Sequence, residues 1–160
     1  MANRKVNIFQ KIGSLIRGYK GYAIRDEKRN TDKKLREGMA QIIQESEKRI
    51  IEYQQQLIKV NKIQLCQEWE IARKALNTIY SQIKNAVYGE SSFFSNQQLK
   101  ETELDEIYSI DLSMVERVHL IFKTTDVDIN ESMSAGFVVQ QVKEIDNILQ
   151  KRTNFINQFK

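Results

Sequence analysis

Residues 35–87 read LREGMAQIIQESEKRIIEYQQQLIKVNKIQLCQEWEIARKALNTIYSQIKNAV, and their apolar pattern indicates helices. Its apolar residues recur at steps of three and four, which is the period of one face of an α-helix. One stripe contains Leu35, Met39, Ile42, Ser46, Ile50, Tyr53, Leu57 and Val60, and the next contains Leu65, Trp69, Ala72, Leu76, Ile79, Ile83 and Val87. The stretch has no proline and one glycine, so we expect long helices here.

The two stripes could lie on one continuous helix or on two helices joined by a turn. A single helix from Tyr22 to Tyr88 would be about 100 Å long, because each residue adds about 1.5 Å. A chain of 160 residues cannot bury one face of so long an element. We therefore expect a tight reversal near Asn61 or Lys62 that makes an antiparallel pair of helices.

The remaining segments also have helical patterns. Residues 4–19 form an expected amphipathic helix. One short helix is expected to open at the capping-box pair Ser95 and Gln98, and a second at a cap formed by Asp111 or Ser113. A last long helix is expected from about residue 130 to 159. Its stripe contains Met133, Phe137, Val138, Val142, Ile145, Leu149, Arg152 and Ile156.

These elements predict an all-α protein with no sheet. The architecture that we expect is an elongated up-and-down helical bundle of three long helices plus two or three short ones. Residues 1–22 form a basic amphipathic N-terminal arm, and residues 23–160 form a single helical-bundle domain. The Phe93–Phe94 pair is expected to cover one end of the bundle.

Charge is distributed unevenly along the chain. The net charge of +4 combines +8 in residues 1–36 with −4 in the remaining residues. The segment from Arg25 to Lys34 contains no apolar residue, and a helix that is polar all round does not pack on a core. We therefore expect this segment to be an exposed stalk or a fraying helix end.

Several residue pairs resemble parts of catalytic or metal sites without completing one. Glu116 and His119 have the spacing of a metal-ligand pair, but a di-iron bundle needs two such pairs and the chain has one histidine. Asp126, Asp128 and Asn130 lack the glycine and glutamate that complete a calcium loop. Cys66 is expected to be a buried, inert thiol within a helix. No glycine-rich phosphate loop occurs. We expect no catalytic residues, no metal and no cofactor.

The function that fits these features is that of a non-enzymatic helical interaction or scaffold protein. It is expected to act in the cytoplasm and to self-associate as a homo-oligomer or bind a protein partner.

One alternative is a peripheral membrane protein, anchored to anionic lipid at the inner membrane face by its N-terminal helix. The face that would contact lipid consists of Phe9, Ile12, Ile16 and Tyr19, bordered by Arg4, Lys11, Arg17 and Lys20.

A second alternative is non-specific nucleic-acid binding, in which a basic stretch attracts phosphate groups without reading their sequence. The stretch consists of Arg25, Lys28, Arg29, Lys33, Lys34 and Arg36. The acidic body and the small net charge disfavour this partner.

Overall fold

The computed structural model describes residues 2–88, 91–95, 98–126 and 135–159, with side chains from residue 8 onward. This part of the chain is helical and contains no strand, which confirms the all-α prediction. The elements are α1 (Ala2–Leu15), η1 (Arg25–Glu27), α2 (Lys28–Lys59), α3 (Ile63–Lys84), η2 (Ser92–Phe94), α4 (Glu101–Asp126) and α5 (Ala135–Asn157), where η denotes a 3₁₀-helix.

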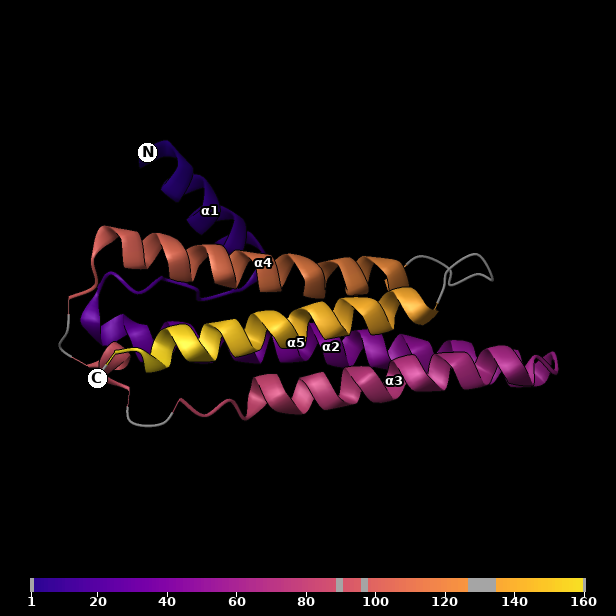
Figure 1. Cartoon of the computed structure of the whole chain (residues 1–160). Coiled ribbons are helices and arrows are strands. Elements are labelled where there is room, and N and C mark those ends of the chain that lie inside the picture. The colour runs from indigo at the N-terminus through magenta and orange to yellow at the C-terminus, as the bar shows by residue number, and fades with distance from the viewer. Residues whose placement is uncertain (1, 89–90, 96–97, 127–134, 160) are drawn as a thin grey trace.

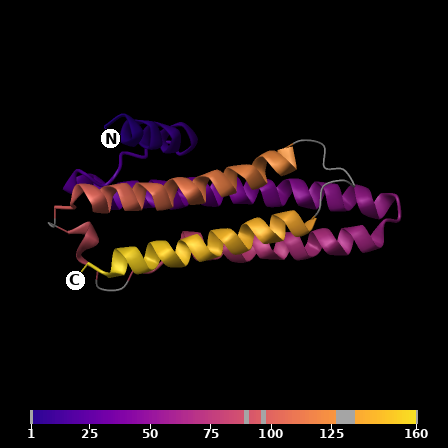
Figure 2. The same ribbon diagram turned by 45° about the horizontal axis from the view of Figure 1, so that its top comes forward.

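The four long helices form an elongated bundle, and α1 lies outside it against α4 (Figures 1 and 2). Chain direction alternates from each long helix to the next (Figure 1). The packed pairs are α2 with α3, α3 with α5, α5 with α4, and α4 with α2. Helices α3 and α4 therefore lie across a diagonal. Helix η2, which lies between them in the sequence, is at one end of the bundle (Figure 2).

The reversal expected near Asn61 is present. Helix α2 ends at Lys59 and α3 begins at Ile63. Asn61 has a positive φ of 60°, a left-handed conformation that asparagine tolerates better than most residues. The backbone N–H of Lys62 donates to the carbonyl of Leu57 at 2.9 Å, which closes the turn. The loss of helical geometry at three residues is thus enough to fold the two stripes against each other.

The two short helices expected after residue 95 are instead one helix, α4, of 26 residues. Helix α4 begins at Glu101. The backbone N–H of the preceding residue, Lys100, donates to Glu103 Oε2 at 2.7 Å. Asp111 and Ser113 lie in the middle of this helix and cap nothing. Asp111 is buried, where it accepts hydrogen bonds from Arg152 of α5 and from Tyr19 and Tyr22 of the segment between α1 and η1. The bundle therefore has four long helices and not three.

The exposed stalk expected at residues 25–34 is also wrong. Within the first turns of α2, Lys28, Thr31 and Asp32 are buried. Thr31 Oγ1 donates to the carbonyl of Gly21 at 2.8 Å, and Lys28 Nζ donates to the carbonyl of Phe93 at 3.1 Å. The polar side chains face the interior because the fold supplies hydrogen-bond partners there.

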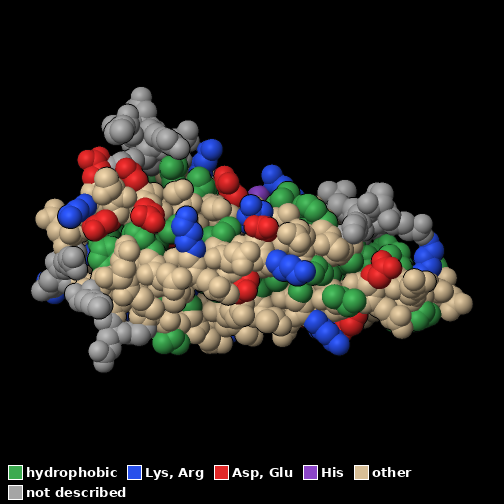
Figure 3. Space-filling model, in the orientation of Figure 1, with side chains coloured by type: hydrophobic (Ala, Val, Ile, Leu, Met, Phe, Trp, Pro, Cys, Tyr) green, Lys and Arg blue, Asp and Glu red, His purple; other side chains and the backbone are tan. Residues whose placement is uncertain are grey.

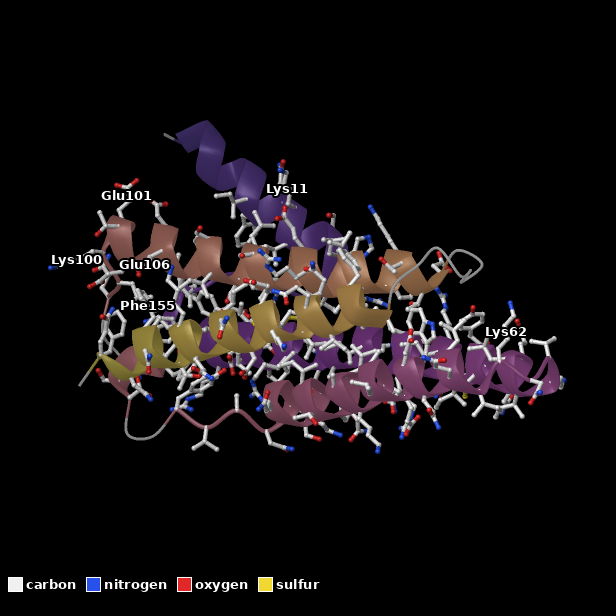
Figure 4. All side chains as sticks on the ribbon, turned by 45° about the vertical axis from the view of Figure 1, so that its right-hand side comes forward. Lys11, Lys62, Lys100, Glu101, Glu106 and Phe155 are labelled. Carbon is white, nitrogen blue, oxygen red and sulfur yellow. The ribbon has the colours of Figure 1, made fainter. Side chains whose placement is uncertain are left out.

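Aromatic side chains close the end of the bundle that carries η2, as the Phe93–Phe94 pair predicts. Phe93 is fully buried, and its ring lies 5.3 Å from that of Tyr22 and 5.4 Å from that of Phe159. Phe155, labelled in Figure 4, lies at the same end. The backbone N–H of Ser92 donates to the carbonyl of Phe159 at 3.0 Å. These contacts fix the C-terminal end of α5 beneath η2.

The opposite end of the bundle is a projecting hairpin. The last turn of α4 is level with Arg49 of α2, since Asp126 pairs with Arg49 at 2.5 Å. Helix α2 continues to Lys59, which is ten residues or about 15 Å farther. Figures 1 and 2 show α2 and α3 reaching past the ends of α4 and α5, and Lys62 marks the tip in Figure 4.

Candidate functional site

The most concentrated polar chemistry of the described chain lies inside the bundle, around Arg152 of α5. Arg152 Nε donates to Asp111 Oδ1 at 2.7 Å, and Nη2 donates to the hydroxyl of Tyr22 at 2.8 Å. Asp111 Oδ2 in turn accepts from the hydroxyls of Tyr22 at 2.6 Å and Tyr19 at 2.8 Å. Arg152 and Asp111 are both completely buried.

A second carboxylate completes this cluster. Arg152 Nη1 donates to Asp32 Oδ1 at 2.8 Å and also to the hydroxyl of Tyr88. The Tyr88 hydroxyl donates to the same Asp32 oxygen at 2.8 Å, and Arg36 Nε donates to Asp32 Oδ2 at 3.0 Å. We call these seven residues the buried polar cluster: Tyr19, Tyr22, Asp32, Arg36, Tyr88, Asp111 and Arg152.

The cluster is electrically balanced, with two guanidinium groups facing two carboxylates. Burial alone would raise the pKa of Asp32, but the charges of Arg152 and Arg36 outweigh it and hold this pKa below its usual value. Burial raises the pKa values of Tyr19 and Tyr22 well above the usual value, so both phenols stay protonated near neutral pH. Buried charges that are paired and hydrogen-bonded in this way avoid the cost of an unpaired charge in the interior.

The buried polar cluster joins segments that are distant in the sequence. Arg152 is 120 residues from Asp32 and 130 from Tyr22. The cluster thus connects helices α2, α4 and α5 with the segment that holds Tyr22 and the segment that holds Tyr88. Sequence reasoning missed this cluster, although one signal was present: Arg152 falls within the apolar stripe of the last helix, where a charged residue needs a buried partner.

The face predicted to contact lipid is turned toward the protein. Ile12, Ile16 and Tyr19 are buried, and the ring of Phe9 lies 5.9 Å from that of Tyr108 on α4. Ile16 lies so close to Gly38 of α2 that a Cβ there would be 2.9 Å from Ile16 Cδ1. The border residues Lys11, Arg17 and Lys20 are exposed, and the side chain of Arg4 lies outside the described residues.

The basic stretch is divided by the fold. Lys28 is buried, and Arg36 is held by Asp32 and by the carbonyl of Lys84 at 2.7 Å, so neither can take part in a basic surface. The exposed members are Arg25, Arg29, Lys33 and Lys34. Glu37 pairs with Lys33 at 3.8 Å and with Lys34 at 4.0 Å. On the face in Figure 3, basic and acidic side chains are interspersed.

The residues considered for metal or thiol chemistry lie on separate surfaces. Glu116 and His119 line a groove of 330 Å³ between α1 and α4, together with Lys11 and Lys123. Cys66 lies instead on α3, near Gln54 of α2, and it is half-buried and not buried as expected. Among the described residues, no group of three or more His, Cys, Asp or Glu side chains could hold a metal ion. Asp128 and Asn130 of the calcium-like loop lie outside the described residues.

The projecting hairpin carries an apolar groove between α2 and α3, which we call the tip groove. Its volume is 470 Å³, and its lining residues are Ile51, Gln54, Gln55, Ile58, Ile63, Cys66, Gln67 and Glu70. All three isoleucines of this lining are partly exposed to solvent, with exposed fractions of 39% for Ile51, 57% for Ile58 and 46% for Ile63. Hydrophobic side chains reach the surface in this projecting region in Figure 3.

The sole charged residue of the tip groove is already paired. Glu70 accepts from Arg73 Nη2 at 2.6 Å and Nε at 2.8 Å, and from Gln54 Nε2 at 3.0 Å. The hydrogen bonds from Arg73 and Gln54 lower the pKa of Glu70 to about 2. The groove can therefore contact an apolar surface without leaving an unpaired carboxylate.

None of the described helices is long and apolar enough to cross a membrane. Comparison with known proteins gives no further guide to the site, because no protein-family model, curated protein or solved structure matches the chain.

Proposed function

We propose that this chain is a non-enzymatic helical interaction protein, and that its tip groove is the surface that contacts a protein partner. The observation that carries the proposal is the exposure of three neighbouring isoleucines on a hairpin that projects from the bundle. Apolar side chains exposed singly are ordinary on protein surfaces, whereas a contiguous apolar groove marks a place where another molecule binds. An amphipathic helix is the simplest element that fits between two helices.

The interior of the protein supports a structural role. Every nitrogen of the Arg152 guanidinium group donates a hydrogen bond within the buried polar cluster. That cluster joins α2, α4 and α5 through hydrogen bonds, and we expect a bundle joined in this way to present the projecting hairpin in one orientation. Preorganisation of this kind lowers the entropic cost of binding a partner. A cytoplasmic location is part of the proposal, because the free thiol of Cys66 stays reduced there.

Membrane attachment through α1 has less support. The apolar side chains that would enter the lipid, Ile12 and Ile16, are buried against α4 and α2. Attachment would require α1 to leave the bundle and expose that surface. Nucleic-acid binding has less support still, because the exposed cations Lys33 and Lys34 face a carboxylate of the same helix.

Photo-crosslinking inside the host cell tests the proposal. The photoreactive amino acid p-benzoylphenylalanine would replace Gln55, an exposed residue of the tip groove. A matched control would carry it at Gln82, an exposed residue near the far end of α3. We expect a discrete protein adduct from position 55 alone. Equal adducts from both positions, or none from position 55, would contradict the proposal.

A further inference from the structure

The groove of 330 Å³ between α1 and α4, which we call the side groove, combines apolar and basic side chains. Helix α1 lies outside the four-helix bundle in Figure 1, and Lys11 is labelled on it in Figure 4. The lining residues are Lys11, Ser14 and Leu15 of α1 and Leu112, Glu116, His119, Leu120 and Lys123 of α4.

Three leucines form the apolar part of the side groove. Leu15 and Leu112 are half-buried and pack against the hydrophobic core, whereas Leu120 is 41% exposed. Leu112 and Leu120 are eight residues apart on α4, which corresponds to about 12 Å along the helix. A linear alkyl chain that lies along this strip loses contact with water, and that transfer is favourable.

The basic groups of the side groove are not neutralised by the protein. Among the residues that the structure describes, no carboxylate forms an ion pair with Lys11 or Lys123. The lining has two lysines and one glutamate, so its net charge is +1 when His119 is neutral. A ligand with a single negative charge balances this lining, whereas a cation is repelled by it.

The end of the side groove that holds Lys123 is the place for an anionic head group. His119 precedes Lys123 by one helical turn, so the two side chains are neighbours on α4. The ring of His119 stacks on that of Phe122 with the centroids 6.0 Å apart, which restricts the orientation of the imidazole. An imidazole N–H and an ammonium group can both donate to one carboxylate. Glu116 is seven residues, or about 10 Å, from Lys123 along the helix, so it leaves this end to the ligand.

We propose that the side groove binds a single-chain amphiphile with one carboxylate group, which is the chemistry of a fatty acid. The carboxylate contacts Lys123 and His119, Lys11 adds a positive charge from α1, and the alkyl chain lies along the leucines. This inference does not rest on the proposed function, because the side groove and the tip groove share no residue.

Isothermal titration calorimetry of the full chain tests the proposal, with dodecanoate below its micellar concentration as the probe. We expect saturable binding of one dodecanoate per chain. Acetate, which has the same head without the tail, should give no measurable binding. Dodecyltrimethylammonium, which has the same tail with a positive head, should bind at least about tenfold more weakly.

Two variants locate the binding in the side groove. Lys123→Met removes the charge and keeps an apolar side chain, and it should raise the Kd for dodecanoate by about tenfold, which corresponds to about 1.4 kcal/mol. Leu120→Gln interrupts the apolar strip and should also raise this Kd. The matched controls are Lys143→Met on α5 and Ile71→Gln on α3, which change exposed residues outside the groove and should leave the Kd unchanged.

The helical circular dichroism separates loss of binding from loss of folding. All four substituted side chains are exposed, so the spectrum should be the same in every variant. Absence of saturable dodecanoate binding, equal binding of the two surfactants, or equal effects of Lys123→Met and Lys143→Met would overturn the proposal. Flotation of the wild-type chain with anionic vesicles that Lys123→Met weakens would also overturn it, in favour of a membrane surface.

Discussion

Arg152 of α5 and Asp111 of α4 form an ion pair in which both side chains are completely buried, with Nε 2.7 Å from Oδ1. Removing two such charges from water costs several kcal/mol each, so the pair persists through its additional hydrogen bonds. Those bonds come from the hydroxyls of Tyr19 and Tyr22, which precede the bundle in the sequence. The pair therefore attaches the N-terminal segment to α4 and α5.

Removal of the central guanidinium group should destabilise the fold strongly. Arg152→Met leaves Asp111 and Asp32 buried without their shared cation, and we expect a loss of about 3–5 kcal/mol in the free energy of unfolding. Urea denaturation followed by circular dichroism measures this loss. Lys33→Met breaks an ion pair whose side chains are both largely exposed, so it should cost less than about 1 kcal/mol. Equal effects of the two changes would show that the cluster does not carry this stability.

Alkaline pH should unfold the protein through its buried phenols. Burial raises the folded-state pKa values of Tyr19 and Tyr22 above the usual value. Their contribution to stability is therefore complete below about pH 10, the usual tyrosine pKa, and is lost as the pH rises toward the folded-state values. Ultraviolet absorbance of tyrosinate should rise for these residues together with the loss of helical circular dichroism. Ionisation of all six tyrosines near pH 10 in a folded chain would contradict the burial.

Two glycine-to-alanine changes should have opposite signs. Gly21 has φ +79°, and a Cβ there would lie 2.5 Å from Tyr108 Oη and 2.6 Å from Phe9 Cε2. Gly13 lies within α1 with nothing within 4 Å of its Cβ position. We expect Gly21→Ala to destabilise the protein, and Gly13→Ala to stabilise it by about 0.5–1 kcal/mol. Thermal unfolding of the two variants compares them directly, and a neutral Gly21→Ala would show that this turn is not as close-packed as described.

The N-terminal helix should behave as part of the core. Ile12 is completely buried, so Ile12→Asp places an unpaired carboxylate in an apolar site and should cost roughly 3 kcal/mol or more. Lys11→Asp, at an exposed neighbouring position, should cost much less. The wild-type chain should not float with vesicles of anionic lipid at physiological salt. Flotation that Ile12→Asp abolishes without loss of folding would instead support membrane attachment through α1.

The helical class and most core positions could be predicted from the sequence, because both follow from local spacing. The stripes of α2 and α3 predict buried residues such as Leu35, Ile50, Trp69 and Leu76, and all four are buried. The reversal at Asn61 was predictable from length, because one continuous helix would have left its apolar face uncovered. These conclusions depend on residues close together in the chain.

Which polar residues are buried could not be predicted from the sequence, because it depends on how distant helices pack. Asp32 lies in a segment without apolar residues, and Asp111 has the pattern of a helix cap, yet both are buried because Arg152 meets them from a distant helix. The burial of a charge depends on the position of its partner in space, and spacing along the chain does not encode that position. The diagonal arrangement of α3 and α4 and the projection of the hairpin likewise follow from packing among four helices, which periodicity in each helix leaves open.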